Sequence, residues 1–155
     1  MKKLRKLLRL NRGERWTLAQ AMILLPLTAL ALRLIGLRRS QRIFSHFIPR
    51  DSDCKTEGSE ASLNQALHIS HLVNLAVRHG VFPANCLQRS LALWWLLRRR
   101  RIQGEIKVGT RKVSGRFEAH AWIEVDGVVL NDSDDVRLRY APFDRAVNLI
   151  RAGRQ

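Results

Sequence analysis

Residues Arg116–Asp132, RFEAHAWIEVDGVVLND, carry the pattern that decides the fold. Apolar and polar residues alternate on both sides of Asp126-Gly127, a pair typical of tight β-turns. The preceding stretch Glu105–Lys112, EIKVGTRK, alternates in the same way and is followed by a turn at Ser114-Gly115. The sequence therefore predicts a small antiparallel sheet, with strands at 105–112, 116–125 and 128–132.

Upstream of residue 104 the periodicity is helical instead. Asn85 is a favoured N-cap residue, and the apolar residues of Cys86–Arg99 recur at helical spacing. A second helix is expected from Ser62 to Gly80, and two more segments at 16–32 and 39–48, the last stopped by Pro49. Helices followed by an antiparallel sheet indicate the α+β class.

The composition is that of a globular domain with a strong positive charge. The chain has 155 residues, 46% hydrophobic, and a formal net charge of +15. This length can bury a core without disulfides, and two cysteines with no evident secretory signal indicate a reducing cytoplasm. The charge favours anionic partners, but nucleic acid is not favoured because no zinc-finger spacing or RNA-binding aromatic motif is present.

The stretch Trp16–Leu32 is uncharged and only just long enough to span a membrane. Pro26 and several polar residues weaken that reading, so a buried or interfacial helix is favoured. The basic first ten residues could hold such a helix against an anionic membrane surface, which leaves a peripheral membrane contact open.

Cys86 is the candidate nucleophile, because it opens the helix that Asn85 caps. Helix N-termini favour thiolates, and a nucleophilic cysteine needs a base and a group that orients the base. His120 lies in a strand between two alanines, and Trp122 points to the same side, where it could wall a substrate pocket. Asp132 ends the next strand. No metal site is expected, since His68 and His71 have no third ligand nearby.

The register of the hairpin decides whether His120 and Asp132 can meet. A two-residue turn would put His120 opposite Ser133 and turn Asp132 to the other face. A three-residue loop, Val125–Gly127, would place His120 directly across from Asp132, with Gly127 in the left-handed conformation that such a loop needs. We predict the three-residue loop, and with it that Asn131 points away.

These residues form a candidate Cys-His-Asp triad. Cys86 would attack a carbonyl carbon, His120 would accept and return the proton, and Asp132 would orient the imidazole. The backbone N–H of Cys86 is the candidate oxyanion donor. If an amine rather than water completed the reaction, the chain would be a transglutaminase or amidase. A third interpretation is a non-catalytic, basic, membrane-associated adaptor.

The combination of NCLQRSLALWWLLRRRRI, GEIKVGTRK and FEAHAWIEVDGVVLND resembles the transglutaminase-like cysteine peptidases of lasso peptide biosynthesis, the B-type leader peptidases in their short form. The resemblance covers about residues 63–132. It places the family's catalytic residues on Cys86, His120 and Asp132 and implies a papain-like or transglutaminase-like fold. Arg101 stands where a glycine is common in the family.

The resemblance also implies a biosynthetic setting. The substrate would be the leader of a ribosomally made precursor peptide, removed through a thioester intermediate. A separate small protein would recognise the leader, in line with the short form, and an ATP-using cyclase similar to asparagine synthetase would close the ring. No cofactor is expected in this chain. We expect one domain over 1–155, with a helical extension at 1–60 and a catalytic core at 61–140, in the bacterial cytoplasm.

Overall fold

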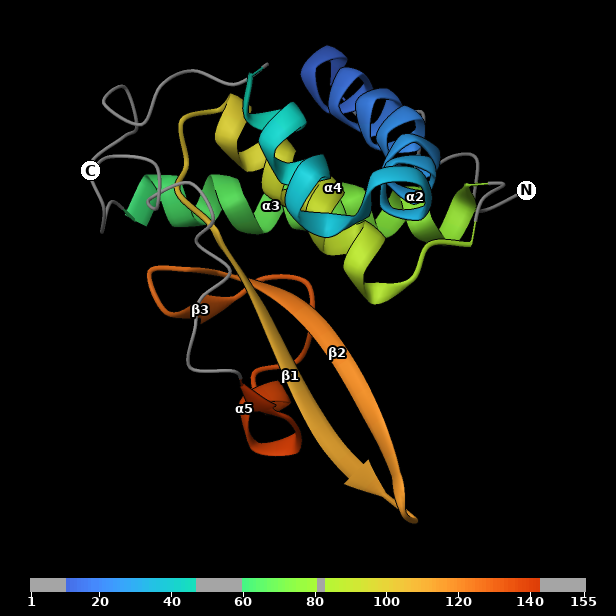
Figure 1. Ribbon diagram of the computed structural model, residues 1–155. Helices are drawn as coiled ribbons and strands as arrows, with labels where there is room; N and C mark the ends of the chain where they lie inside the picture. The colour runs from blue at the N-terminus through green and yellow to red at the C-terminus, as the bar shows by residue number, and fades with distance from the viewer. Residues whose placement is uncertain (1–10, 47–59, 81–82, 143–155) are drawn as a thin grey trace, which may run out of the picture.

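The computed structural model describes residues 11–46, 60–80 and 83–142, and it has the predicted α+β class. Helices precede an antiparallel sheet of order β3-β2-β1-β4. The elements are α2 (Arg12–His46), α3 (Glu60–His79), α4 (Cys86–Arg99), β1 (Glu105–Val113), β2 (Arg116–Val125), β3 (Val128–Val129), α5 (Val136–Arg139) and β4 (Ala141–Pro142). The three long helices gather at one end of the β1–β2 hairpin, and the tip of the hairpin projects away from them (Figure 1).

Helix α2 consists of two helical segments. Gly36, with φ 73° and ψ 171°, breaks the helix, which agrees with the two segments that the sequence predicts. The first begins earlier than predicted, because the side chain of Asn11 accepts from the N–H of Glu14 at 2.8 Å and caps it. The predicted end of the second segment, and Cys54, lie outside the described residues.

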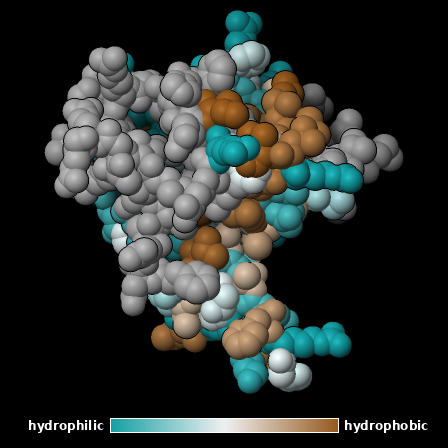
Figure 2. Space-filling model, in the orientation of Figure 1, coloured by the Kyte–Doolittle hydropathy of each residue, from teal (hydrophilic) through white to brown (hydrophobic). Residues whose placement is uncertain are grey.

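One face of α2 belongs to the core and the other is exposed. The oxygen Oγ1 of Thr28 donates to the carbonyl of Gln88 at 3.4 Å, and Arg100 donates to Oγ1 of Thr17 at 2.5 Å, so α2 is bonded to α4 at two places. Arg12–Gly36 is also long and apolar enough to cross a membrane by length and composition. Apolar side chains gather over α2 in Figure 2. The exposed ones along this face are Trp16, Ile23, Leu27, Leu30 and Leu34.

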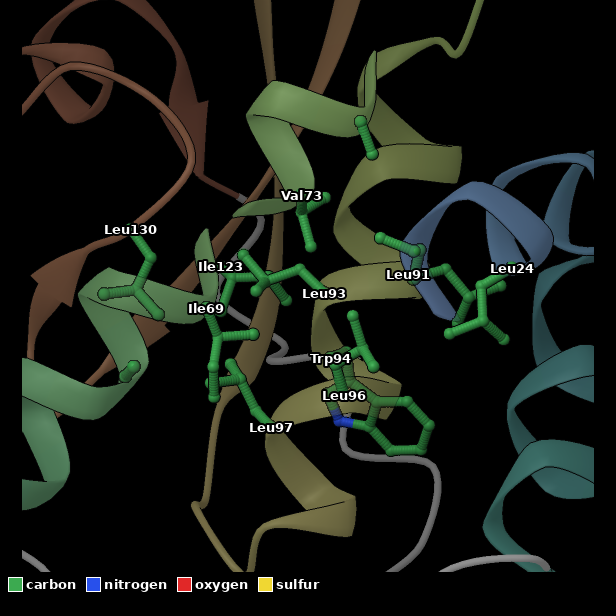
Figure 3. Close-up of a cluster of buried hydrophobic side chains, with 14 of the residues drawn as sticks. Leu24, Ile69, Val73, Leu91, Leu93, Trp94, Leu96, Leu97, Ile123 and Leu130 are labelled. Carbon is green, nitrogen blue, oxygen red and sulfur yellow. The ribbon is translucent and has the colours of Figure 1, made fainter. Parts of the chain in front are cut away.

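The main core forms around α4, whose apolar residues are almost all buried. It receives side chains from α2, α3 and β2, and Figure 3 shows Leu24, Ile69 and Ile123 meeting Leu91 and Leu97 there. Helix α4 has the predicted bounds. Helix α3 begins at Glu60, two residues before the predicted start at Ser62.

Helix α4 ends in a Schellman motif, a C-terminal cap that normally uses glycine. The N–H of Ile102 donates to the carbonyl of Leu97 at 3.0 Å, and the N–H of Arg101 donates to that of Arg98 at 2.9 Å. Arg101 has a φ of 60°, in the left-handed region. Arg101 therefore keeps a turn that normally uses glycine, at a conformational cost of about 1 kcal/mol.

The predicted register between β2 and β3 is wrong. Val125 pairs with Val128 and Glu124 with Val129, so the hairpin has the two-residue turn Asp126-Gly127. Both turn residues have positive φ, 48° and 78°, which is the type I′ geometry favoured by the twist of the strands. The pairing stops at Val129, whereas the sequence predicted a strand to Asp132. Helix α5 and strand β4, which pairs with β1, were not predicted.

Candidate functional site

The N-terminus of α4 is defined by a reciprocal cap that puts Cys86 in the first turn. The N–H of Gln88 donates to Oδ1 of Asn85 at 2.9 Å, and the N–H of Asn85 donates to Oε1 of Gln88 at 3.0 Å. Cys86 follows at once and is a half-buried free thiol. The predicted cap is confirmed, and the nucleophile candidate lies where the free N–H groups of the helix begin.

His120 and Asp132 do meet, although not for the predicted reason. Nε2 of His120 lies 2.5 Å from Oδ2 of Asp132, and the two side chains are 18% and 14% exposed. This contact leaves Nδ1 as the ring nitrogen that can exchange a proton with a thiol. In the observed register a straight strand would turn Asp132 to the other face, so something must redirect the chain after Val129.

Asn131 and Ser70 redirect the chain. In a regular ladder the N–H of Ile123 would donate to the carbonyl of Leu130, but it donates to Oδ1 of Asn131 at 2.7 Å. The carbonyl of Leu130 instead accepts from Oγ of Ser70 on α3 at 2.7 Å. A side chain thus replaces a main-chain acceptor, the strand ends, and Asp132 reaches the face of His120. Asn131 turns into the interior, where it is 3% exposed and bonds to Ile123 and Ser90, and its pointing away from the face of His120 stays a prediction.

Ser90 connects this network to the helix that carries Cys86. Its Oγ donates to the carbonyl of Ala121 at 3.1 Å and accepts from Nδ2 of Asn131 at 2.9 Å. Arg89 also reaches the site, with a nitrogen 3.9 Å from Oδ2 of Asp132. Residues three and four apart share a helix face, so Cys86 lies on the face that Arg89 and Ser90 turn to β2 and Asp132. The structure thus brings His120 and Asp132 into contact and packs α4, which carries Cys86, against β2.

Asp132 is held as a carboxylate. Burial alone would raise its pKa, but the hydrogen bonds from His120, the N–H of Ser133 and Arg139, with the charge of His120, outweigh burial and lower the pKa. Nitrogen Nη2 of Arg139 lies 2.9 Å from Oδ1. Arg139 comes from α5, an element that the sequence did not predict.

Two aromatic rings enclose the imidazole of His120 from behind. Tyr140 stacks on it at 4.9 Å between ring centroids, and Trp122 at 6.3 Å. Gly109, the cross-strand partner of His120, leaves room for both residues. A Cβ at this position would lie 3.0 Å from the ring of Trp122 and 3.0 Å from Cβ of Tyr140. Trp122 is fully buried beside the imidazole, and its role as a wall of a substrate pocket stays a prediction.

An open pocket of about 430 Å³ lies beside Asp132, between α3 and the segment after β3. Its lining includes Asn74, Arg78, Arg89 and Ser133. The polar lining next to the dyad is suited to a polar or charged ligand. Among the described residues no group of three or more His, Cys, Asp or Glu could hold a metal ion, and His68 lies 2.9 Å from Glu14.

Sequence reasoning missed the structural roles of Ser70, Ser90, Asn131, Arg139 and Tyr140. Of these, only Ser90 gave a signal, because a hydroxyl one turn after Cys86 on an apolar helix must find a partner when it is buried. The others act through contacts between segments far apart in the chain, which periodicity cannot show.

Comparison with known proteins gives two matches. A sequence family described as the transglutaminase-like superfamily matches residues 29–145. The microcin J25-processing protein McjB of Escherichia coli is 34% identical over 86 residues, which are 54% of this chain and 40% of that protein. The chain thus spans less than half the length of this curated relative. No solved structure matches the chain significantly.

Proposed function

The chain belongs to the transglutaminase-like superfamily, as the sequence predicted, and from this premise we propose that it is a cysteine peptidase with the triad Cys86, His120 and Asp132. The observation that carries the proposal is the 2.5 Å contact of His120 with Asp132 beside the first turn of α4. A base, its orienting carboxylate and a thiol at a helix N-terminus are the parts that acyl transfer through a thioester requires.

The proposed reaction has two stages. Sγ of Cys86 attacks the carbonyl carbon of the substrate while Nδ1 of His120 takes the thiol proton. The N–H of Cys86 donates to the oxyanion. The C–N bond then breaks, His120 gives its proton to the leaving amine, and a thioester remains. Water attacks the thioester, passes a proton to His120, and releases the acid as the thiol re-forms. Asp132 keeps Nε2 protonated throughout and stabilises the imidazolium.

The proposed substrate is the leader region of a ribosomally made lasso peptide precursor. The similarity to a microcin J25-processing protein supports this choice. We further propose that a separate small protein presents the leader and that an ATP-using cyclase, similar to asparagine synthetase, acts on the product. The proposed location is the cytoplasm, with peripheral contact between the exposed face of α2 and anionic membranes.

Mass spectrometry tests the proposal. The full chain is incubated with its precursor peptide and the recognition protein, and we expect a mass loss equal to the leader. Cys86→Ala should abolish cleavage, His120→Ala should lower kcat by orders of magnitude, and Asp132→Ala by less. Cys54→Ala is the matched control and should cleave like the wild type.

Other results of this experiment would support the alternative functions. A product in which an added amine replaces water would assign the chain to acyl transfer. Cleavage that survives Cys86→Ala would refute the triad. Binding of the precursor without any cleavage by the wild type would favour a non-catalytic adaptor.

A further inference from the structure

The two turns of the hairpin determine which backbone groups of β2 face its free edge. Ser114-Gly115 and Asp126-Gly127 are both two-residue turns with positive φ, so the pairs that close them are hydrogen-bonded pairs. Arg116 therefore bonds to β1, and Val125 bonds to β3. Between them the direction alternates, so odd-numbered residues of β2 direct their N–H and carbonyl groups away from β1. The bonds of Ile123 to Leu130 and Asn131 agree with this alternation.

Strand β3 covers only the inner end of that edge. It pairs with Glu124 and Val125, and Leu130 adds one bond to Ile123. The carbonyl of Ala121 is taken by Ser90. Farther out, within the described part of the chain, the outward backbone groups of Phe117 and Ala119 have no main-chain partner. Both residues are exposed, and this part of the hairpin projects beyond the helices (Figure 1).

This open edge runs directly into the candidate active site. Ala119 precedes His120, and Ser90, which closes the edge at Ala121, lies one helical turn after Cys86. An unpaired strand edge is a template for another extended chain. Phe117 stands on the same edge with 78% of its surface exposed, where it could contact a side chain of such a partner.

We propose that the open edge of β2 at Phe117 and Ala119 binds an extended stretch of the peptide substrate as an added strand. Main-chain hydrogen bonds would form at every second substrate residue and so guide the scissile bond between His120 and Cys86. The occupant is a polypeptide because the edge offers alternating N–H and carbonyl groups at the spacing of a strand. This inference rests on the proposed peptidase function and names how the same site holds its substrate.

An N-methyl scan of the substrate tests the proposal. The probes are synthetic peptides that span the cleaved bond, each with one N-methylated amide. Methylation at alternate positions on one side of the bond should lower kcat/KM about tenfold, the effect of losing one hydrogen bond, and the positions between should be tolerated. A loss without this two-residue period would overturn the proposal.

Proline variants test the same edge from the side of the protein. Phe117→Pro removes an N–H that points to the open edge of β2. Lys112→Pro is the matched control, because Lys112 is the cross-strand partner of Phe117 and its N–H points out from the opposite edge. Phe117→Pro should lower kcat/KM about tenfold relative to Phe117→Ala. Lys112→Pro should leave kcat/KM unchanged relative to Lys112→Ala. Equal losses would overturn the proposal.

Hydrogen exchange separates this proposal from the proposed chemistry. With Cys86→Ala and a saturating precursor peptide, the amides of Phe117 and Ala119 should gain protection, and that of Lys112 should not. Protection without any cleavage by the wild type would support the docking edge and refute the peptidase. Cleavage by the wild type without such protection would refute the docking edge alone.

Discussion

Replacing Asn131 with alanine should both destabilise the protein and disable its site. Asn131 is 3% exposed, and its side chain makes two hydrogen bonds, of 2.7 Å from the N–H of Ile123 and 2.9 Å to Ser90. Ile123 is fully buried, so its N–H would be left without an acceptor, at about 1–3 kcal/mol. Ser90 would lose the hydrogen bond from Asn131 but keep its bond to Ala121, so this second loss is worth about 1 kcal/mol or less. We expect the free energy of unfolding to fall by about 1–4 kcal/mol.

Urea denaturation followed by tryptophan fluorescence measures this change without reference to the proposed activity. Ser90→Ala is the control, because it removes both bonds of the hydroxyl but leaves the N–H of Ile123 satisfied; it should cost about half as much. Asn131→Ala should also lower kcat about a hundredfold, since a displacement of Asp132 by 1 Å is enough for that effect. A change below about 0.5 kcal/mol, or an equal cost for Ser90→Ala, would refute this role of Asn131.

Four further predictions concern other parts of the chain. Arg101→Gly should raise the free energy of unfolding by about 1 kcal/mol in urea, because Arg101 holds a φ of 60°; no gain would contradict the strain. Gly109→Ala should cost about 1–3 kcal/mol and lower cleavage, because the new Cβ presses on the ring of Trp122, on Cβ of Tyr140 and on the carbonyl of Ala141 behind His120; unchanged kinetics would show that these groups adjust. The pKa of Asp132 is lowered in the folded state, so its stabilisation is present above its ordinary value of 3.8 and is lost as the pH falls through the folded pKa. Acid titration of Asp132→Asn should lack this loss, and identical acid curves would contradict it. The double variant Ile23→Ser, Leu27→Ser should sediment less than the wild type with anionic vesicles at low salt, and equal sedimentation would exclude this face as the membrane contact.

Local signals predicted the three long helices, although α5 was missed. The cap at Asn85 and the apolar face that follows it lie within a few residues of each other, so they define α4 from Cys86 to Arg99 without knowledge of the rest of the fold. The division of α2 into two segments and the presence of a hairpin around Asp126-Gly127 are local in the same sense, although the length of the turn was predicted wrongly.

The meeting of His120 and Asp132 was predicted through an incorrect register. The alternation of residues along the strands led to the prediction of a three-residue loop. The closing turn instead has two residues, and the chain leaves the ladder at Asn131. That departure depends on Ser70 and Ser90, which lie some 40 to 60 residues away in the sequence. No pattern of neighbouring residues could show it, nor could it place Tyr140 on the imidazole.

The bond from Ile123 to the side chain of Asn131 has a consequence for the recognition of distant relatives. In an unbroken antiparallel ladder, the length of the turn fixes whether the number of residues between two side chains that face each other is odd or even. Here a side chain ends the ladder before the carboxylate, so that arithmetic does not apply to His120 and Asp132. Sequence searches for sites of this kind should therefore allow the interval between histidine and aspartate to be odd or even, and should look for a buried amide just before the aspartate.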